Sequence, residues 1–398
     1  MTTAAGLALV ALGAHYFVRL AAFSRGFART VRQAEQTAAT PADPPFVTVI
    51  VAARNEEAVI GRCVDAILAS DYPTDRFEVI VSDDDSSDAT AEVVRQRRAV
   101  PAGGDGADDA AALRVVHVPH DPDRLRAHKK RAIEWAVREA RGEIVLTTDA
   151  DCVVSPGWLP AMAAAFDDPA TVFASGPVRY DTAGGLFARL QALDFLGLMA
   201  CGAGGIGIGK PNLANGASVA WRREVFESLG GFSGIDDVTS GDDELLMQKI
   251  AYDRPEAGLG PHSIRFVNRP EAVVVTEPVR DVGAFLHQRK RWASKGTRYQ
   301  PELQAMLIGL VLFFGGLVLA TLAVPFVPAL APWLLGGYGL KAAADLAVLL
   351  PSTRRYRQRG LLAVYPVYAV THAFHSLFVG LVGPLSRGFE WKGRSLDR

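Results

Sequence analysis

Short β-branched apolar runs alternate with segments of helical periodicity in the first half of the chain. The apolar runs cover residues 45–53, 77–85, 113–118 and 143–151. Apolar residues recur at helical spacing between the first two runs, and a second helix is predicted from about Lys129 to Ala140. Strands that alternate with helices in this way predict an α/β fold with a mostly parallel sheet.

Long stretches without charge flank this alternating region. Residues 4–23 are long enough to cross a bilayer, which takes about 20 mostly apolar residues. Residues 303–340 contain no charged side chain, and three prolines predict a turn between two spans at about 303–325 and 331–351. A further apolar stretch covers 361–385.

This division predicts four parts along the chain. They are a transmembrane anchor (1–24), a soluble domain (25–302), a transmembrane region of two to three helices (303–386) and a basic tail (387–398). Arginines that follow Phe23 place the soluble domain in the cytoplasm by the positive-inside rule, so we expect a multi-pass protein of the inner membrane. Three C-terminal spans would put the basic tail outside, so the number of spans and the side of the C-terminus stay open.

Composition narrows the classes of function. The 398 residues are 49% hydrophobic with a formal net charge of −1, and this near-neutral balance gives no reason to expect nucleic acid as a partner. The three cysteines show no C-x-x-C spacing, which favours a reducing compartment, and Cys152 is expected to be a small buried residue. No G-x-G-x-x-G follows the first strand, which argues against a Rossmann oxidoreductase; the glycines of 202–209 predict a flexible loop.

Two acidic clusters end predicted strands, where open parallel sheets bind ligands. In the cluster 82–88, Asp83 and Asp84 can accept hydrogen bonds from a base or a ribose, and Ser86 or Ser87 is predicted to cap the next helix. In the second cluster, Asp149 and Asp151 project to the same side of their strand. Paired carboxylates suit a divalent cation, Mg²⁺ or Mn²⁺, which completes its shell with water and phosphates.

A third acidic group and a basic run complete the candidate chemistry. Asp242, Asp243 and Glu244 open a predicted helix; one of them suffices for capping, and Asp243 is the candidate general base. In the run 287–296, Gln288 and Arg291 share a helix face, where Arg can neutralise a departing diphosphate, and Trp292 can stack on a sugar. Lys341 and Asp345, four residues apart in an apolar stretch, are expected to pair with each other.

The ordered motif set resembles the family 2 inverting glycosyltransferases. The resemblance is to membrane-bound members with a Q-x-x-R-W motif, such as cellulose, hyaluronan and poly-N-acetylglucosamine synthases and ceramide glucosyltransferases. It covers roughly residues 45–300. It rests on ARNEE (53–57), DD-x-S-x-D (83–88), Lys129, DAD (149–151), the pair 242–243 and QRKRW (288–292).

The resemblance implies a GT-A-like nucleotide-sugar-binding domain and a role for each matching residue. Contacts to the nucleoside would come from Ala53, Arg54, Glu56 and Asp84. Lys129 and Asp149 would bind the diphosphate region, and Asp151 the metal. Asp243 would be the base of a single inverting displacement. The remaining motif residues would hold the diphosphate and the acceptor end: Asp242, Gln288, Arg291 and Trp292. Two positions depart from the family pattern, since Asp85 replaces a glycine and Asp242 a glutamate.

Three functions remain open at this stage. The favoured one is transfer of a sugar, with a UDP-sugar as the expected donor, to a lipid or lipid-linked acceptor. A processive polysaccharide synthase is the first alternative, because Q-x-x-R-W occurs in both groups. A non-catalytic nucleotide-binding membrane protein is the second, but it predicts damaged motifs, and these are intact. Oligomerisation and the identity of the glycan or lipid acceptor are left open.

Overall fold

The computed structural model describes residues 2–98, 111–119, 127–253, 258–386, 389–391 and 394–396. Residues 99–110, which are rich in Gly, Ala and Asp, and the basic side chains of the tail lie outside these residues. Contacts divide the chain into two units, each described here by itself. The sheet unit comprises Thr30–Arg179, Gly209–Glu277 and Gly388–Arg398. The helical unit comprises Met1–Arg29, Tyr180–Ile208 and Pro278–Arg387, so it includes three segments of the span 25–302 (25–29, 180–208 and 278–302).

A seven-stranded sheet with the order β3-β2-β1-β4-β8-β6-β9 is the centre of the sheet unit. Its strands are β1 (Val47–Ala53), β2 (Phe77–Asp83), β3 (Ala112–His117), β4 (Ile144–Asp149), β6 (Phe173–Ser175), β8 (Val219–Arg222) and β9 (Ile264–Phe266). A smaller sheet contains β5 (Val153–Val154), β10 (Val274–Thr276) and β7 (Val178–Tyr180), and a hairpin contains β11 (Phe389–Trp391) and β12 (Arg394–Leu396). The unit's helices are α2 (Ile60–Leu68), α3 (Thr90–Arg98), α4 (His128–Glu139), α5 (Trp158–Ala164), α7 (Arg223–Ser228) and α8 (Glu244–Tyr252).

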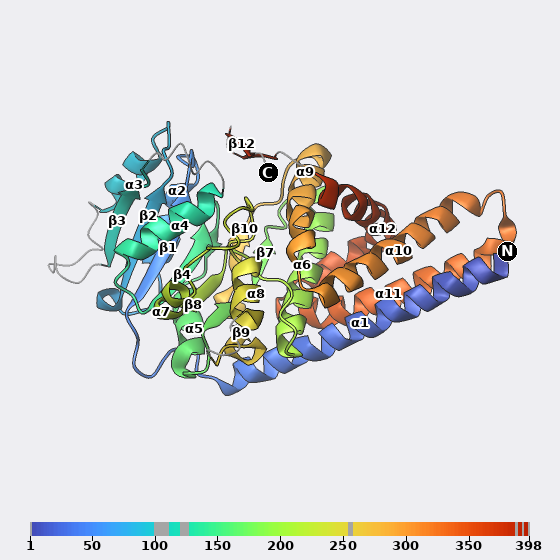
Figure 1. Ribbon diagram of the computed structural model, residues 1–398, viewed down its shortest axis with the longest axis horizontal. Helices are drawn as coiled ribbons and strands as arrows, with labels where there is room; N and C mark the ends of the chain where they lie inside the picture. The colour runs from blue at the N-terminus through green and yellow to red at the C-terminus, as the bar shows by residue number, and fades with distance from the viewer. Residues whose placement is uncertain are drawn as a thin grey trace. The chain divides into compact units, whose positions relative to one another are not determined.

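The predicted parallel sheet is confirmed for four strands. β3, β2, β1 and β4 pair in parallel, whereas β8 pairs antiparallel with both β4 and β6. The chain steps outward from β1 to β2 and β3 and then returns to β4, with α4 lying across β1 and β2 (Figure 1). β2 and β3 are added on one side of β1, and β4 is added on its other side. The strand order therefore reverses between β1 and β4, and open parallel sheets bind ligands at such a switch point.

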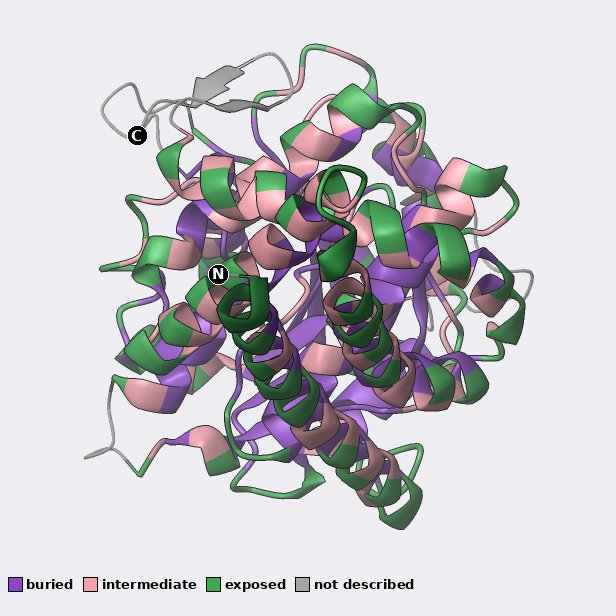
Figure 2. Ribbon diagram, turned by 90° about the vertical axis from the view of Figure 1, so that its right-hand side faces the viewer, coloured by how far each residue is buried: buried purple, intermediate pink, exposed green. Residues whose placement is uncertain are grey.

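The apolar runs identified in the sequence make the core of this unit. Six of the seven residues of β1 and all seven of β2 are buried, which is typical of parallel strands covered on both faces. Figure 2 colours the buried residues of the chain purple. On α2, the buried residues include Ile60, Cys63, Val64 and Ile67, so its helical periodicity faces the core as predicted. Cys152 is 1% exposed, as expected.

Glu78 on β2 is a buried charge at the opposite end of the strand from its acidic terminus. Its carboxylate accepts hydrogen bonds from the hydroxyl of Thr48 (2.8 Å) and the backbone N–H of Arg141 (2.7 Å). The guanidinium groups of Arg114 and Arg141 each lie 3.1 Å from the same carboxylate. Burial raises the pKa of Glu78, but these hydrogen bonds and charges outweigh it and leave the pKa below its ordinary value.

Glu78→Gln is therefore expected to destabilise the chain by about 1–3 kcal/mol near neutral pH. A lowered folded-state pKa contributes stability above the unfolded value of about 4.3, and this contribution is lost as pH falls through the folded value. The difference in thermal midpoint between wild type and Glu78→Gln should stay constant above about pH 5 and shrink below about pH 4. The exposed Glu92 provides the control, and a difference that grows on acidification would contradict the assignment.

The helical unit contains α1 (Thr2–Gln36, through Arg29), α6 (Leu186–Gly207), α9 (Val282–Ala293), α10 (Pro301–Ala323), α11 (Ala331–Arg355) and α12 (Tyr365–Val382). Short 3-10 helices in the two units are Thr74–Arg76, Ala165–Asp167, Pro261–Ser263, Pro270–Ala272, Ser294–Arg298, Pro328–Leu330, Arg359–Val364 and Gly383–Leu385. Within the described residues, five helical segments are long and apolar enough to cross a membrane: Thr2–Gln36, Leu186–Gly207, Pro301–Ala323, Pro328–Arg355 and Arg359–Leu385.

The flexible loop predicted at residues 202–209 is wrong, because α6 continues to Gly207. The reason is tertiary packing against α1. A methyl group added to Gly204 would lie 2.3 Å from the carbonyl oxygen of Phe23, and one added to Gly207 would lie 2.1 Å from that of Gly26. Small residues at this spacing permit close approach of two helix backbones, so these glycines form a helix contact.

The expected pairing of Lys341 with Asp345 is confirmed. The ammonium lies 2.5 Å from the carboxylate, and both side chains are buried on α11. The hydroxyl of Tyr16 on α1 also donates to Asp345 at 2.6 Å. The pair therefore connects two helices of the unit, in addition to neutralising itself.

Candidate functional site

A lysine flanked by two carboxylates lies at the carboxyl end of the central sheet. The ammonium of Lys129, in the first turn of α4, is 2.7 Å from Asp149 and 2.8 Å from Asp242. Asp149 is the last residue of β4, and Asp242 lies just before α8. The fold thus brings together three predicted residues that are far apart in the sequence.

The ammonium of Lys129 is held in its charged form. Burial lowers its pKa, but the charges of Asp149 and then Asp242 outweigh burial and raise the pKa well above its ordinary value. A fixed positive charge with donors in this position is suited to bind the oxygens of a diphosphate.

Asp243 is the N-cap residue of α8, and two backbone N–H groups orient its carboxylate. One carboxylate oxygen accepts a hydrogen bond from Glu244 (2.7 Å), and the other accepts one from Gly216 (2.8 Å). A methyl group on Gly216 would lie 3.0 Å from the Lys129 ammonium, 3.1 Å from Asp242 and 3.5 Å from Asp243. Gly216 therefore marks the point where three predicted polar groups converge.

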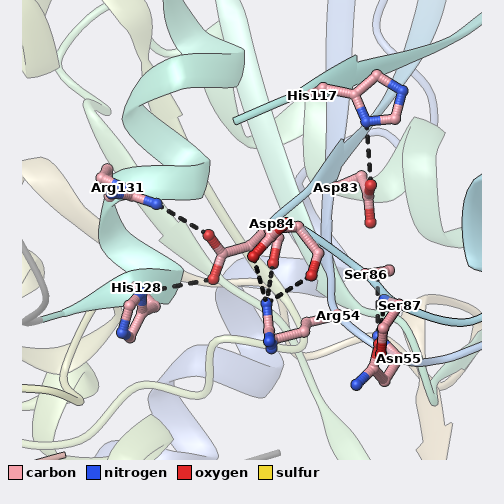
Figure 3. A network of polar contacts seen from close by, with 10 residues as sticks. Arg54, Asn55, Asp83, Asp84, Ser86, Ser87, His117, His128 and Arg131 are labelled. Atoms are coloured by element: carbon pink, nitrogen blue, oxygen red, sulfur yellow. Dashed lines mark hydrogen bonds and ion pairs between the residues drawn. The ribbon is translucent and has the colours of Figure 1, made fainter. Parts of the chain in front are cut away.

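Two loops after β1 and β2 are joined by hydrogen bonds (Figure 3). The guanidinium of Arg54 donates to the backbone carbonyls of Asp84 (2.5 Å) and Asp85 (2.7 Å). The side-chain oxygen of Asn55 accepts from the N–H of Ser87 (2.9 Å). Asn55 (φ 51°) and Asp85 (φ 59°) adopt left-handed backbone conformations. At Asp85 this explains the glycine of the family pattern, because glycine takes this conformation without strain.

The helix cap predicted at Ser86 or Ser87 is wrong. α3 begins at Thr90, and the N–H of Thr90 bonds to Asp88 (3.0 Å). The hydroxyl of Ser86 instead accepts from the N–H of Asn55 (3.0 Å). Ser86 and Ser87 therefore connect the two loops, and Asp88 rather than a serine bonds to the first N–H group of α3.

Asp83 and Asp84 are both buried, but they differ in their contacts (Figure 3). The carboxylate of Asp84 lies 3.0 Å from Arg131 and 3.5 Å from His128. One oxygen of Asp83 lies 3.0 Å from His117, and the other is buried with no hydrogen-bond partner among the described residues. Asp83 therefore offers the acceptor for a donor group of a ligand. The ligating roles of both residues remain predictions.

The predicted cation site has a suitable set of oxygen atoms. Ligand atoms of Asp149, Asp151 and Cys152 lie within 4.8 Å of one another, and Asp151 is exposed. Burial, Asp149 and Asp151 raise the pKa of the Cys152 thiol, so it stays protonated and is a poor ligand. Asp151 and Asp149 fit a hard cation that takes its remaining ligands from phosphate and water.

Gln288, Arg291 and Trp292 lie on α9 in the helical unit. The hydroxyl of Tyr180 donates to the side-chain oxygen of Gln288 at 3.3 Å. The rings of Trp292 and Phe195 have centroids 6.0 Å apart. The predicted common helix face of Gln288 and Arg291 is consistent with α9, whereas their roles in binding remain predictions.

Two family models match this chain. The model described as Glycosyl transferase family 2 matches residues 48–228, and that described as Glycosyl transferase family group 2 matches 144–353, more than half of the chain. The chain belongs to the family 2 glycosyltransferases. Its sheet unit accordingly contains the GT-A-like fold of these enzymes.

Relatives of this glycosyltransferase include enzymes named for a lipid product. It is 30% identical to a beta-monoglucosyldiacylglycerol synthase of Synechocystis sp. over 63% of this chain and 48% of that protein. It is 24% identical to the glycosyltransferase AglE of Haloferax volcanii over 62% of this chain and 71% of that protein. The chain spans about half the length of the glucosyldiacylglycerol synthases that it matches (48% and 49%).

A solved structure resembles nearly the whole glycosyltransferase. It is a mannosyltransferase of Pyrobaculum calidifontis in complex with GDP-Man and Mn²⁺, with 25% sequence identity and a TM-score of 0.57. The match covers 97% of this chain and 99% of that one. A divalent cation and a nucleotide sugar are thus established for a protein of the same fold.

The sequence did not identify several groups that shape the site. His117, His128 and Arg131 contact the acidic residues, yet a lone histidine or arginine carries no sequence signal for such contacts. His128 and Arg131 are three residues apart at the start of α4, so a helix projected from Lys129 would have placed them on one face. Gly216 reaches these groups because β8, which follows it in the sequence, lies next to β4.

Proposed function

We propose that this glycosyltransferase transfers a sugar from a nucleotide-diphosphate sugar to a lipid or lipid-linked acceptor at the cytoplasmic face of the inner membrane. The observation that carries the transfer chemistry is the convergence of Lys129, Asp242 and Asp243 around Gly216. It provides a fixed cation for the diphosphate beside an oriented carboxylate. The membrane location rests on the five apolar helices and the arginines that follow the first of them.

The proposed reaction is a single displacement with inversion of the anomeric carbon. Asp243 accepts the proton of the acceptor hydroxyl as that oxygen attacks, and Lys129 stabilises the charge of the leaving diphosphate. The QRKRW motif, rather than the geometry, is the reason for assigning Arg291 to the same charge. Asp149 and Asp151 would hold Mg²⁺ or Mn²⁺, which when bound supplies further positive charge for the diphosphate. The buried acceptor oxygen of Asp83 and the loop fixed by Arg54 are proposed to recognise the nucleoside, together with Ala53, Glu56 and Asp84.

The lipid acceptor is supported by the relatives named glucosyldiacylglycerol synthase and by the apolar helices. A polymer synthase remains the second candidate because of QRKRW (288–292). The donor is expected to be a UDP-sugar, although the similar mannosyltransferase binds GDP-Man, so both nucleotides belong in the test.

Membranes containing the chain should be incubated with radiolabelled UDP- and GDP-sugars, and the products separated after solvent extraction. A single extractable glycolipid is expected. A ladder of products of increasing length would instead identify a polymer synthase. If the protein still binds nucleotide but forms no labelled product with any donor, the proposed transfer reaction is contradicted.

Asp151→Ala is expected to abolish the metal dependence of donor binding. The variant removes an exposed cation ligand and leaves the Lys129–Asp149 contact in place. Titration calorimetry of the nucleoside diphosphate with and without Mn²⁺ measures this dependence. Asp168→Ala, an exposed carboxylate paired with Arg265, serves as the control, and unchanged metal-dependent affinity in Asp151→Ala would contradict the metal role.

A further inference from the structure

A buried ion pair joins α6 and α9 within the helical unit. Asp194 and Arg289 are 5% and 4% exposed, and the guanidinium lies 2.8 Å from one carboxylate oxygen. Asp194 belongs to no motif identified in the sequence, whereas Arg289 is one of the two variable positions inside QRKRW (288–292). Isolated charges are costly in such an environment, so the pair has to be maintained by specific contacts.

The second oxygen of Asp194 faces α12. The hydroxyl of Tyr368 donates to it at 3.3 Å, and the Nε2 atoms of His372 and His375 lie 3.6 Å and 3.8 Å away. Asp194 therefore connects α6 to both α9 and α12, and its two oxygens serve different helices.

Arg289 depends on Asp194 for charge compensation. Its guanidinium lies over the rings of Trp292 (4.4 Å to the centroid) and Phe285 (4.9 Å). Its Nε and Nη1 atoms are buried and have no hydrogen-bond partner among the described residues. Removal of the Asp194 charge would leave a buried guanidinium uncompensated, which favours a rearrangement of α9.

The same turn of α9 carries the Q-x-x-R-W residues. Trp292 contacts both the Arg289 guanidinium and the ring of Phe195, the neighbour of Asp194 on α6. Phe195 in turn stacks on Tyr180 (4.4 Å between centroids), whose hydroxyl donates to Gln288. Asp194 and Phe195, which are consecutive on α6, are thus linked to the motif. Asp194 is linked to Trp292 through Arg289, and Phe195 is linked to Gln288 through Tyr180.

We propose that Asp194 is a positioning residue for sugar transfer: through Arg289 it fixes the orientation of Gln288 and Trp292 on α9. This inference rests on the proposed function, in which these α9 residues hold the diphosphate and the acceptor end. Small misplacements of groups that orient substrates can lower turnover by about 10²-fold, so the pair acts on the rate without touching the reacting atoms.

A metal ion is the competing explanation of this cluster. The ligand atoms of Asp194, His372 and His375 lie within 4.8 Å of one another. However, Asp194 is the one carboxylate among these three residues, and the Arg289 guanidinium 2.8 Å away already compensates its charge, so no second carboxylate is left to offset a divalent cation. Asp194 is therefore assigned as the counter-ion of Arg289, and the metal content of the purified protein is measured as part of the test.

Asp194→Asn keeps the size of the side chain and removes its charge. Its kcat for transfer is expected to fall about 10- to 100-fold, with a smaller loss of affinity for the nucleoside diphosphate, because Lys129 and the other proposed nucleotide contacts of the sheet unit are unchanged. The fluorescence contribution of Trp292, defined by difference from Trp292→Phe, should change as well. Asp194→Asn with Arg289→Gln removes both charges and should regain part of the lost kcat.

A matched pair of tyrosine variants separates positioning from general stability. Tyr368→Phe deletes the hydroxyl bonded to Asp194, and Tyr16→Phe deletes one bonded to Asp345 in the same unit. Both should lower the thermal midpoint, but only Tyr368→Phe should lower kcat. An unchanged kcat in Asp194→Asn, equal losses in the two tyrosine variants, or a bound metal that is lost in His372→Ala would overturn the inference. An inactive wild type would contradict the proposed function instead.

Discussion

Asp243→Asn is expected to lose sugar transfer by about 10²–10⁴-fold while it still binds the nucleotide sugar. The amide has no charge with which to accept the proton of the acceptor hydroxyl. Asparagine remains a good N-cap residue, and its single side-chain oxygen can still accept from the N–H of Glu244 or of Gly216, so α8 should persist. The loss would then report chemistry rather than folding.

Initial rates of glycolipid formation and calorimetric donor affinity, both on purified protein, measure the two halves of this prediction. Asp253→Asn, at the other end of α8, is the matched control and should transfer at the wild-type rate. A purified Asp243→Asn variant as active as wild type would exclude Asp243 as the base. A variant that also fails to bind the donor would show that Asp243 is needed for the structure of the site.

Lys129→Met is expected to lower kcat/KM by at least about 30-fold, mainly through weaker donor binding. Without the ammonium, Asp149 and Asp242 lose the cation that now lies within 2.8 Å of each, and they would repel both one another and the diphosphate. A bound divalent cation can offset part of this repulsion, so the defect should be largest at low Mn²⁺ concentration.

Donor titrations at several Mn²⁺ concentrations measure this effect. Arg138→Met removes an exposed cation from the same helix and is the control, for which unchanged kinetics are expected. If Lys129→Met binds the donor as tightly as wild type at every Mn²⁺ concentration, the ammonium has no part in diphosphate recognition.

Local patterns were sufficient to predict the parallel half of the sheet. The runs at 45–53, 77–85, 113–118 and 143–151 became β1 to β4 because consecutive β-branched residues require burial on both faces. The antiparallel insertion of β8 between β4 and β6 was not predicted, since strand order depends on long-range pairing. That insertion brings Gly216 to the site.

The glycines of 202–209 show why a composition rule failed. Glycine usually marks a loop because it weakens an isolated helix by about 1 kcal/mol. In α6, Gly204 and Gly207 instead permit contact with the backbone of α1, and the packing of two helices outweighs the local preference. The sequence contained the apolar character of residues 186–207 but no information on the partner helix.

The order of acidic and basic motifs, the apolar runs and the uncharged stretches determined by themselves the family, the fold class and most candidate residues, because strand termini and helix starts are encoded locally. Only the tertiary structure decided which charges meet. Lys129 bridges Asp149 and Asp242, Asp84 is paired with Arg131, and Asp194 compensates Arg289. The partners lie between 20 and 113 residues apart in the sequence, and the low dielectric that makes such pairs decisive exists only once the core has formed.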